Sequence, residues 1–169
     1  MEGERALARC ASGRVGRGLV FSLSRVARSE AGCGRGGGTE WMARKCHPQK
    51  IIGVDFSSKN IDFCTNTHHH ENLIFQVADV ENLPFRNALF DAIVNVESSH
   101  CYGSLSTFVS EVHRVLKPNG YFLWADLWHT EREEALFQKL DNGGMELKHS
   151  LDITPQVLEA ITVEENKKK

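Results

Sequence analysis

Residues 31–38 read Ala-Gly-Cys-Gly-Arg-Gly-Gly-Gly, and this segment restricts the fold of the chain more than any other. Glycine lets a backbone turn tightly and approach a ligand that any Cβ would push away. A helix is expected directly after the glycines, with Thr39 as its N-cap, so that free N–H groups and the positive end of the helix dipole face the same ligand. The segment predicts a binding site for an anionic or zwitterionic group.

A short apolar strand at residues 51–55 follows and ends in a carboxylate, Asp55. Nucleotide-binding α/β units place an acid at this distance from the glycines, where it accepts hydrogen bonds from two ribose hydroxyls. Loop, helix and acid together indicate an adenosine-containing cofactor. Gly32, Gly34 and Gly37 also fit the dinucleotide spacing, so a nicotinamide oxidoreductase is the rival enzyme, although the chain has no recognisable hydride-transfer constellation such as Tyr-x-x-x-Lys.

Strand patterns alternate with helix patterns over the rest of the chain. Apolar strands are predicted at residues 26–31, 51–55, 73–78, 90–96 and 121–127, and an amphipathic helix from about Ser104 stops at residues 117–120. This alternation predicts an α/β fold with a Rossmann-like, doubly wound, mostly parallel sheet and helices on both faces. The first strand is degraded, because Arg28, Ser29 and Glu30 stand where a buried strand carries Val, Ile or Leu.

The length of 169 residues suits one domain. Residues 1–24 are rich in Arg, Gly and Ser and predict a disordered leader, with mitochondrial targeting as the alternative. The domain is expected over residues 25–161, with a last short helix at 154–161, and residues 162–169 form a charged tail. No further strand is expected after the fifth.

Charge and cysteine usage narrow the class of partner. A formal net charge of −2 gives no reason to expect nucleic acid or an anionic membrane surface, and no apolar run approaches the ~20 residues of a membrane-spanning helix. Five scattered cysteines without CxxC spacing indicate reduced thiols and a cytoplasmic location. The three histidines at 68–70 predict a solvated loop rather than a metal site, because consecutive side chains cannot share one helix face.

Five segments taken in order resemble one enzyme family. They are Glu-Ala-Gly-Cys-Gly-Arg-Gly at 30–36, Gly-Val-Asp at 53–55, Ala-Asp-Val-Glu-Asn-Leu-Pro-Phe at 78–85, Phe-Asp-Ala-Ile-Val-Asn-Val-Glu at 90–97 and Arg-Val-Leu-Lys-Pro-Asn-Gly-Tyr-Phe at 114–122. The set is similar to class I S-adenosylmethionine-dependent methyltransferases of the small-molecule group often called type 11. Residues 95–102 most resemble the phthiotriol-type lipid O-methyltransferases.

The resemblance implies S-adenosylmethionine as the cofactor and a small, lipophilic molecule as the methyl acceptor, at a hydroxyl. It places the methionine end of the cofactor against the glycine segment, the ribose on Asp55 and the adenine between Phe56 and the corner formed by Asp79 and Val80. From the residues alone, Asp79 either accepts from an adenine amine or only caps a turn. The implied cofactor-binding residues are Glu30, Gly32, Cys33, Gly34, Asp55, Phe56, Asp79, Val80 and Asn95.

Methyl transfer to an alcohol is helped by a base, and His100 is the candidate, because an imidazole accepts a proton at neutral pH. A histidine bonded to backbone at a strand end is the alternative. Glu97 is the second candidate at the catalytic end, where it shapes the pocket rather than exchanges protons. Because the first strand is degraded and the family's last antiparallel strands are absent, the chain is expected to be truncated. A weakly active or inactive binding protein is therefore the competing function.

Overall fold

The computed structural model describes residues 4–12, 27–129, 131 and 133–167. Seven strands form one sheet in the order β4-β3-β2-β5-β6-β1-β7. The strands are β1 (Glu4–Ser12), β2 (Ala27–Ala31), β3 (Lys50–Asp55), β4 (Leu73–Val77), β5 (Phe90–Val96), β6 (Leu116–His129) and β7 (Glu146–Asp152). The helices are α1 (Gly37–Lys45), α2 (Ser58–Thr67), α3 (Leu105–Val115), α4 (Glu133–Asn142) and α5 (Thr154–Lys167), with a 3-10 turn, η1, at Ser99–Cys101.

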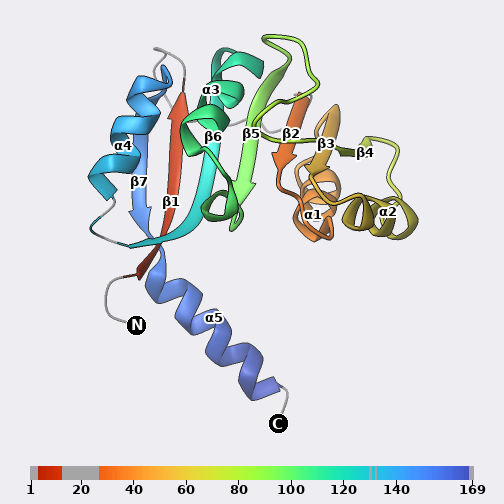
Figure 1. Cartoon of the computed structure of the whole chain (residues 1–169). Coiled ribbons are helices and arrows are strands. Elements are labelled where there is room, and N and C mark those ends of the chain that lie inside the picture. The colour runs from red at the N-terminus through yellow and green to blue at the C-terminus, as the bar shows by residue number, and fades with distance from the viewer. Residues whose placement is uncertain (1–3, 13–26, 130, 132, 168–169) are drawn as a thin grey trace.

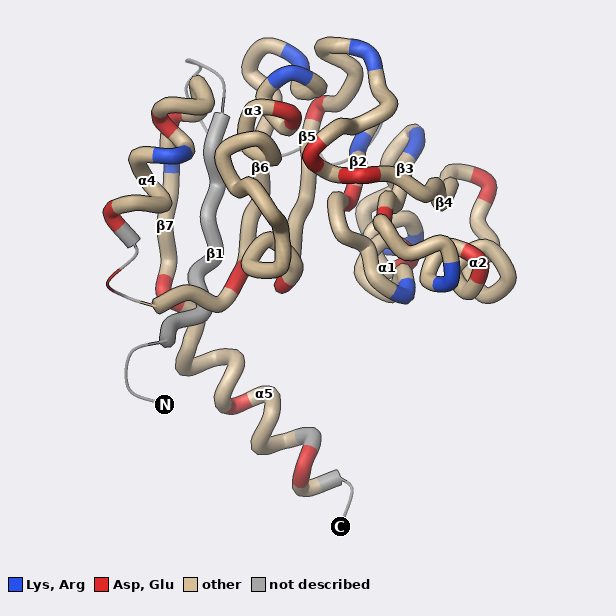
Figure 2. Tube along the Cα trace, viewed as in Figure 1, with Lys and Arg blue, Asp and Glu red and all other residues tan. Residues whose placement is uncertain are grey.

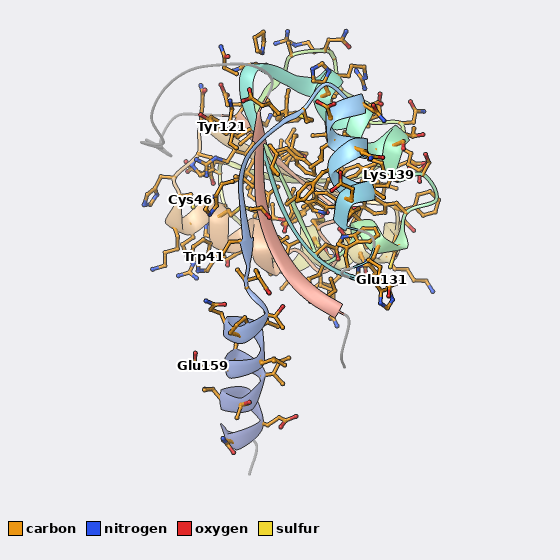
Figure 3. All side chains as sticks on the ribbon, turned by 90° about the vertical axis from the view of Figure 1, so that its left-hand side faces the viewer. Trp41, Cys46, Tyr121, Glu131, Lys139 and Glu159 are labelled. Carbon is orange, nitrogen blue, oxygen red and sulfur yellow. The ribbon has the colours of Figure 1, made fainter. Side chains whose placement is uncertain are left out.

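Five neighbouring strands, β4, β3, β2, β5 and β6, run parallel, which confirms the predicted doubly wound sheet. Helices lie on both of its faces, since Trp41 of α1 stands on one side and Lys139 of α4 on the other (Figure 3). The chain leaves the central strand β2 toward β3 on one side and later adds β5 on the other (Figure 1). Ligands of such sheets bind at the carboxyl ends of the strands, where the strand order reverses.

The first parallel strand forms despite its polar sequence. Arg28, Ser29 and Glu30 are all buried in β2. The Ser29 hydroxyl donates to the Ile52 carbonyl at 2.8 Å, and the Glu30 carboxylate accepts from the Thr39 hydroxyl. Because hydrogen bonds offset the loss of hydration, buried polar side chains take the place of the expected apolar ones.

The far end of the sheet differs from the sequence-based expectation. The leader predicted as disordered over residues 1–24 contains β1, which pairs antiparallel with β6 on one side and with β7 on the other. Residues 1–3 and 13–24 of this predicted leader lie outside the described part. A strand after the fifth was not expected either, yet β7 follows α4. Strand β6 offers a row of backbone donors and acceptors, and pairing with β1 satisfies them.

The C-terminal helix is longer than predicted. It was expected over residues 154–161, with a charged tail over 162–169, whereas α5 continues to Lys167. In Figure 1 this helix extends away from the sheet. Most of the predicted tail is therefore helical.

Ala8→Pro tests the place of β1. Residue 8 pairs with both Ala125 and Leu151, and proline removes its backbone donor from the ladder. Loss of one hydrogen bond of the ladder costs about 0.5–1.5 kcal/mol, which lowers the melting temperature of a chain of this size by a few degrees. Ala8→Ser, which keeps the donor, is the control. Equal melting temperatures for the two variants are inconsistent with a paired strand at this place.

Candidate cofactor and acceptor pockets

A pocket of about 420 Å³ opens at the carboxyl ends of β2, β3 and β5. It includes Asp55 and Phe56 after β3, Asp79 and Val80 after β4, and Glu97 after β5. The complete lining is Gly32, Asp55, Phe56, Asp79, Val80, Glu81, Glu97, Ser98, Cys101, Tyr102 and Gly103. Six of the predicted site residues therefore meet at one surface, whereas Glu30, Cys33, Gly34, Asn95 and His100 are not part of this lining.

The glycine segment forms a tight turn between β2 and α1. Gly32 has a φ of 72°, and a Cβ there would come within 2.5 Å of the Ser98 and Tyr102 hydroxyls. The prediction of Thr39 as N-cap is wrong: the helix begins at Gly37, and Gly36 is the cap residue, with a φ of 79°. A left-handed cap favours glycine, and the Thr39 hydroxyl donates to Glu30 instead.

Glu30 contacts the residues after this turn and is not part of the pocket lining. Its side chain is buried, and a Cβ on Gly38 would lie 2.7 Å from its Oε1 atom. Burial raises the pKa of Glu30 to about 6, against the hydrogen bonds from Thr39, which lower it. The Cys33 thiol is also buried, and desolvation raises its pKa, so it is an unreactive packing group.

Asp55 ties the turn to β3. Its Oδ2 atom accepts from the Gly34 N–H at 2.8 Å. Its Oδ1 atom accepts from the Ser57 N–H at 2.9 Å and from the Asn60 amide at 3.2 Å. A carboxylate has about four acceptor positions, so roughly one is left for a ligand. A second ribose hydroxyl must then share a position with one of these donors.

The adenine end of the pocket has a flat apolar face. Phe56 is 79% exposed, which is unfavourable for an aromatic ring in water and leaves its face free for stacking. Val80 is buried. The Asp79 carboxylate accepts a hydrogen bond from the Glu81 N–H at 2.9 Å. The turn bond that was the alternative role of Asp79 is thus present, and it uses one of the two carboxylate oxygens.

Asn95 does not line the pocket, but it contacts two residues that do, Ser98 and Tyr102. It is fully buried, and its Nδ2 atom lies 2.8 Å from the Ala31 carbonyl, the Ser98 hydroxyl and the Tyr102 hydroxyl. Burial raises the pKa of Tyr102 to about 12, so this phenol is neutral at pH 7. Asn95 therefore fixes two hydroxyl groups at the pocket wall.

A second pocket of about 440 Å³ adjoins the first. It shares Tyr102 and Gly103 with the first pocket and contains His100. Its lining is Ser99, His100, Tyr102, Gly103, Leu105, Trp128, Ala135, Leu136 and Lys139. We call the first the cofactor pocket and the second the acceptor pocket.

His100 forms a pair with a buried acid. Its Nδ1 atom lies 2.6 Å from Asp126 Oδ1, and the Asp126 side chain is 1% exposed against 41% for the imidazole. Asp126 also accepts from the Ser99 hydroxyl and from the Leu127 N–H. A carboxylate at Nδ1 favours the tautomer with a hydrogen there, which leaves the Nε2 lone pair free to accept a proton.

Sequence reasoning missed Asp126. It lies in β6, which pairs in parallel with β5, and the preceding residue Ala125 is opposite Val96. An acid near the predicted carboxyl end of the strand next to the one before His100 is the signal that could have identified it. Glu97, the other catalytic-end candidate, lies in the cofactor pocket with a φ of 49°, and its N–H donates to the Ala125 carbonyl at 2.8 Å.

The described residues contain neither a metal-binding cluster nor a membrane-spanning helix. No group of three His, Cys, Asp or Glu side chains there could hold a metal ion. His68 contacts the Arg35 carbonyl and His70 contacts Glu40. Within the same part of the chain, no helix has the length and apolar character needed to cross a bilayer.

Known methyltransferases are similar in sequence to this chain. A fatty-acid O-methyltransferase of Mycolicibacterium smegmatis is 46% identical over 97 residues, or 57% of this chain and 35% of the relative. A probable phthiotriol/phenolphthiotriol dimycocerosates methyltransferase 2 of Mycobacterium ulcerans is 36% identical over 134 residues, or 79% and 52%. The chain thus spans about a third to a half of these curated relatives.

Solved structures share the fold. The YcgJ protein of Bacillus subtilis is 30% identical, with a TM-score of 0.57 over 61% of this chain and 44% of that one. The [4+2]-cyclase SpnF has a TM-score of 0.65 and 20% identity, over 71% and 50%. The name of the second shows that this fold also carries another reaction, so function must be argued from the site.

The family model of the methyltransferase domain matches residues 29–124, which is more than half of the chain and includes the glycine turn, Asp55, His100 and the end of the parallel sheet. This chain belongs to the methyltransferase domain family described by that model.

Proposed function

We propose that this chain transfers a methyl group from S-adenosylmethionine to a hydroxyl oxygen of a small apolar molecule. The observation that carries the proposal is the pairing of His100 with buried Asp126 in a pocket that adjoins the cofactor pocket. The curated relatives named for fatty-acid and phthiotriol methylation support a lipid-like acceptor. Residues 25–161 are the proposed catalytic unit, and the cytoplasmic location stays a prediction from the cysteines.

The described residues fit the cofactor. Four carboxylates line the cofactor pocket, which suits a ligand with sulfonium and ammonium charges. Exposed Phe56 offers a stacking face for adenine, and Asp55 retains an acceptor for ribose. We assign direct contacts to Gly32, Asp55, Phe56, Asp79 and Val80. Glu30, Cys33, Gly34 and Asn95 are assigned no direct contact with the cofactor. They hold the glycine turn and the lining residues Ser98 and Tyr102 in place.

The reaction needs alignment and one proton transfer. When bound, the cofactor supplies a methyl carbon whose bond to sulfur breaks, with the electron pair going to sulfur, as the acceptor oxygen forms its bond to that carbon. His100 Nε2 takes the hydroxyl proton, and Asp126 stabilises the resulting imidazolium. Tyr102 and Gly103 line both pockets, so the methyl donor and the acceptor hydroxyl are proposed to meet beside these two residues.

Asp55→Ala tests the cofactor assignment. The variant loses a charge-assisted contact worth about 1.5–3 kcal/mol per hydrogen bond, so the affinity for S-adenosylhomocysteine falls by about ten- to a hundredfold in a calorimetric titration. Because Asp55 also holds Gly34 and Ser57, Asp55→Asn is measured as the shape-preserving variant. Asp62→Ala, an exposed acid on α2, is the control. Equal affinity in wild type and both Asp55 variants sinks the assignment.

A further inference from the structure

The two pockets have opposite polarity. The cofactor pocket contains Asp55, Asp79, Glu81 and Glu97. Among the described residues, the acceptor pocket has no acid in its lining, and its polar groups include the His100 imidazole and the Lys139 ammonium. Charges of both signs are otherwise interspersed along the described chain (Figure 2). The contrast is therefore local, and it points to a cationic donor beside an anionic acceptor.

Lys139 has donors to spare. This residue is on α4, and its Nζ atom donates to the Ser106 hydroxyl at 3.2 Å. An ammonium group has three donors, so two remain for a ligand. The contact with Ser106 of α3 holds the amine over the acceptor pocket without neutralising its charge.

The rest of the acceptor pocket has a large share of apolar surface. Leu105, Leu136 and Trp128 belong to its lining. The Trp128 Nε1 atom is buried, so Lys139 is the donor on which the inference rests. Such a lining fits a hydrocarbon body.

We propose that Lys139 is a specificity residue that selects apolar acceptors with a carboxylate, which it binds while the acceptor hydroxyl faces His100. The substrate class is therefore an apolar hydroxy acid. A single ammonium matches a singly charged carboxylate better than a phosphate dianion, which calls for several cationic donors. This inference deepens the proposed function, on which the position of the hydroxyl rests.

The test measures binding, so that it does not depend on catalysis. The full chain, saturated with S-adenosylhomocysteine, is titrated calorimetrically with 3-hydroxydecanoate and with its methyl ester. Loss of the charge removes one charge-assisted contact, so the acid is expected to bind about ten- to a hundredfold more tightly than the ester. Lys139→Met abolishes this preference and Lys139→Arg retains it. Lys45→Met, at an exposed lysine of α1, is the control that keeps it.

The outcomes separate the two proposals. Equal binding of acid and ester by the wild type, no measurable binding of the acid, or a preference that survives in a folded Lys139→Met variant overturns the assignment of Lys139. Melting curves establish that each variant is folded, and restoration of the preference in Lys139→Arg distinguishes charge from packing. An intact preference without any methyl transfer to the hydroxy acid contradicts the proposed function and leaves the carboxylate site standing.

Discussion

His100→Ala is expected to lower methyl transfer to an apolar alcohol by about 10²–10⁴-fold, because the variant loses the group that accepts the hydroxyl proton. The affinity for S-adenosylhomocysteine should stay nearly unchanged, since His100 lines the acceptor pocket and not the cofactor pocket. Single-turnover rates with labelled S-adenosylmethionine, together with calorimetry, give the two quantities. The combination of lost rate and retained affinity is the expected signature.

His69→Ala is the matched control, because His69 is an exposed histidine in the loop before β4. It should retain wild-type turnover. If His100→Ala also keeps its rate within a factor of two on the same alcohol, His100 has a structural role only. The hydrogen bond to Asp126 would then serve the fold of the η1 turn.

Asp126→Asn is expected to have the second large effect. The amide keeps the shape of the side chain and removes the negative charge that stabilises an imidazolium at His100. We expect a fall in turnover of about 10²–10⁴-fold, with unchanged affinity for S-adenosylhomocysteine. Asp126 is a positioning residue, because it touches His100 and lies outside both pocket linings.

A double-variant cycle separates this role from a structural one. If Asp126 acts through His100, Asp126→Asn should change the turnover of His100→Ala by little, because residues of one catalytic unit are not additive. Independent losses that multiply in the double variant contradict the pairing. Thermal melting of all three variants shows whether the change at a buried position has also weakened the fold.

The parallel half of the fold could be predicted because its signals are local. Strand 90–96 has the predicted bounds, and Asp55 ends its strand at the expected place. A continuous apolar run or a short motif predicts each of these elements. Asp126 could not be found in this way, because its meaning depends on a strand neighbour that is distant in sequence. Its side chain touches His100 only once β5 and β6 are paired.

The antiparallel end of the sheet was hidden for another reason. Strand β1 joins β6 through backbone hydrogen bonds, and such bonds leave little trace in an Arg- and Ala-rich segment. The prediction for Thr39 was wrong because its hydroxyl has two possible roles, as an N-cap acceptor or as a donor to a buried acid. A threonine after glycines is a typical N-cap, but here a buried carboxylate takes its hydrogen bond and glycine supplies the cap conformation.

The most direct test of the account is a calorimetric titration of the 169-residue chain with S-adenosylhomocysteine, and separately with NAD. The account predicts saturable one-to-one binding of S-adenosylhomocysteine, weakened in Phe56→Ala because adenine loses its stacking face, and no saturable binding of NAD. Absence of saturable S-adenosylhomocysteine binding, or NAD binding of equal affinity at the same pocket, would contradict the assignment of this site to a methyl donor.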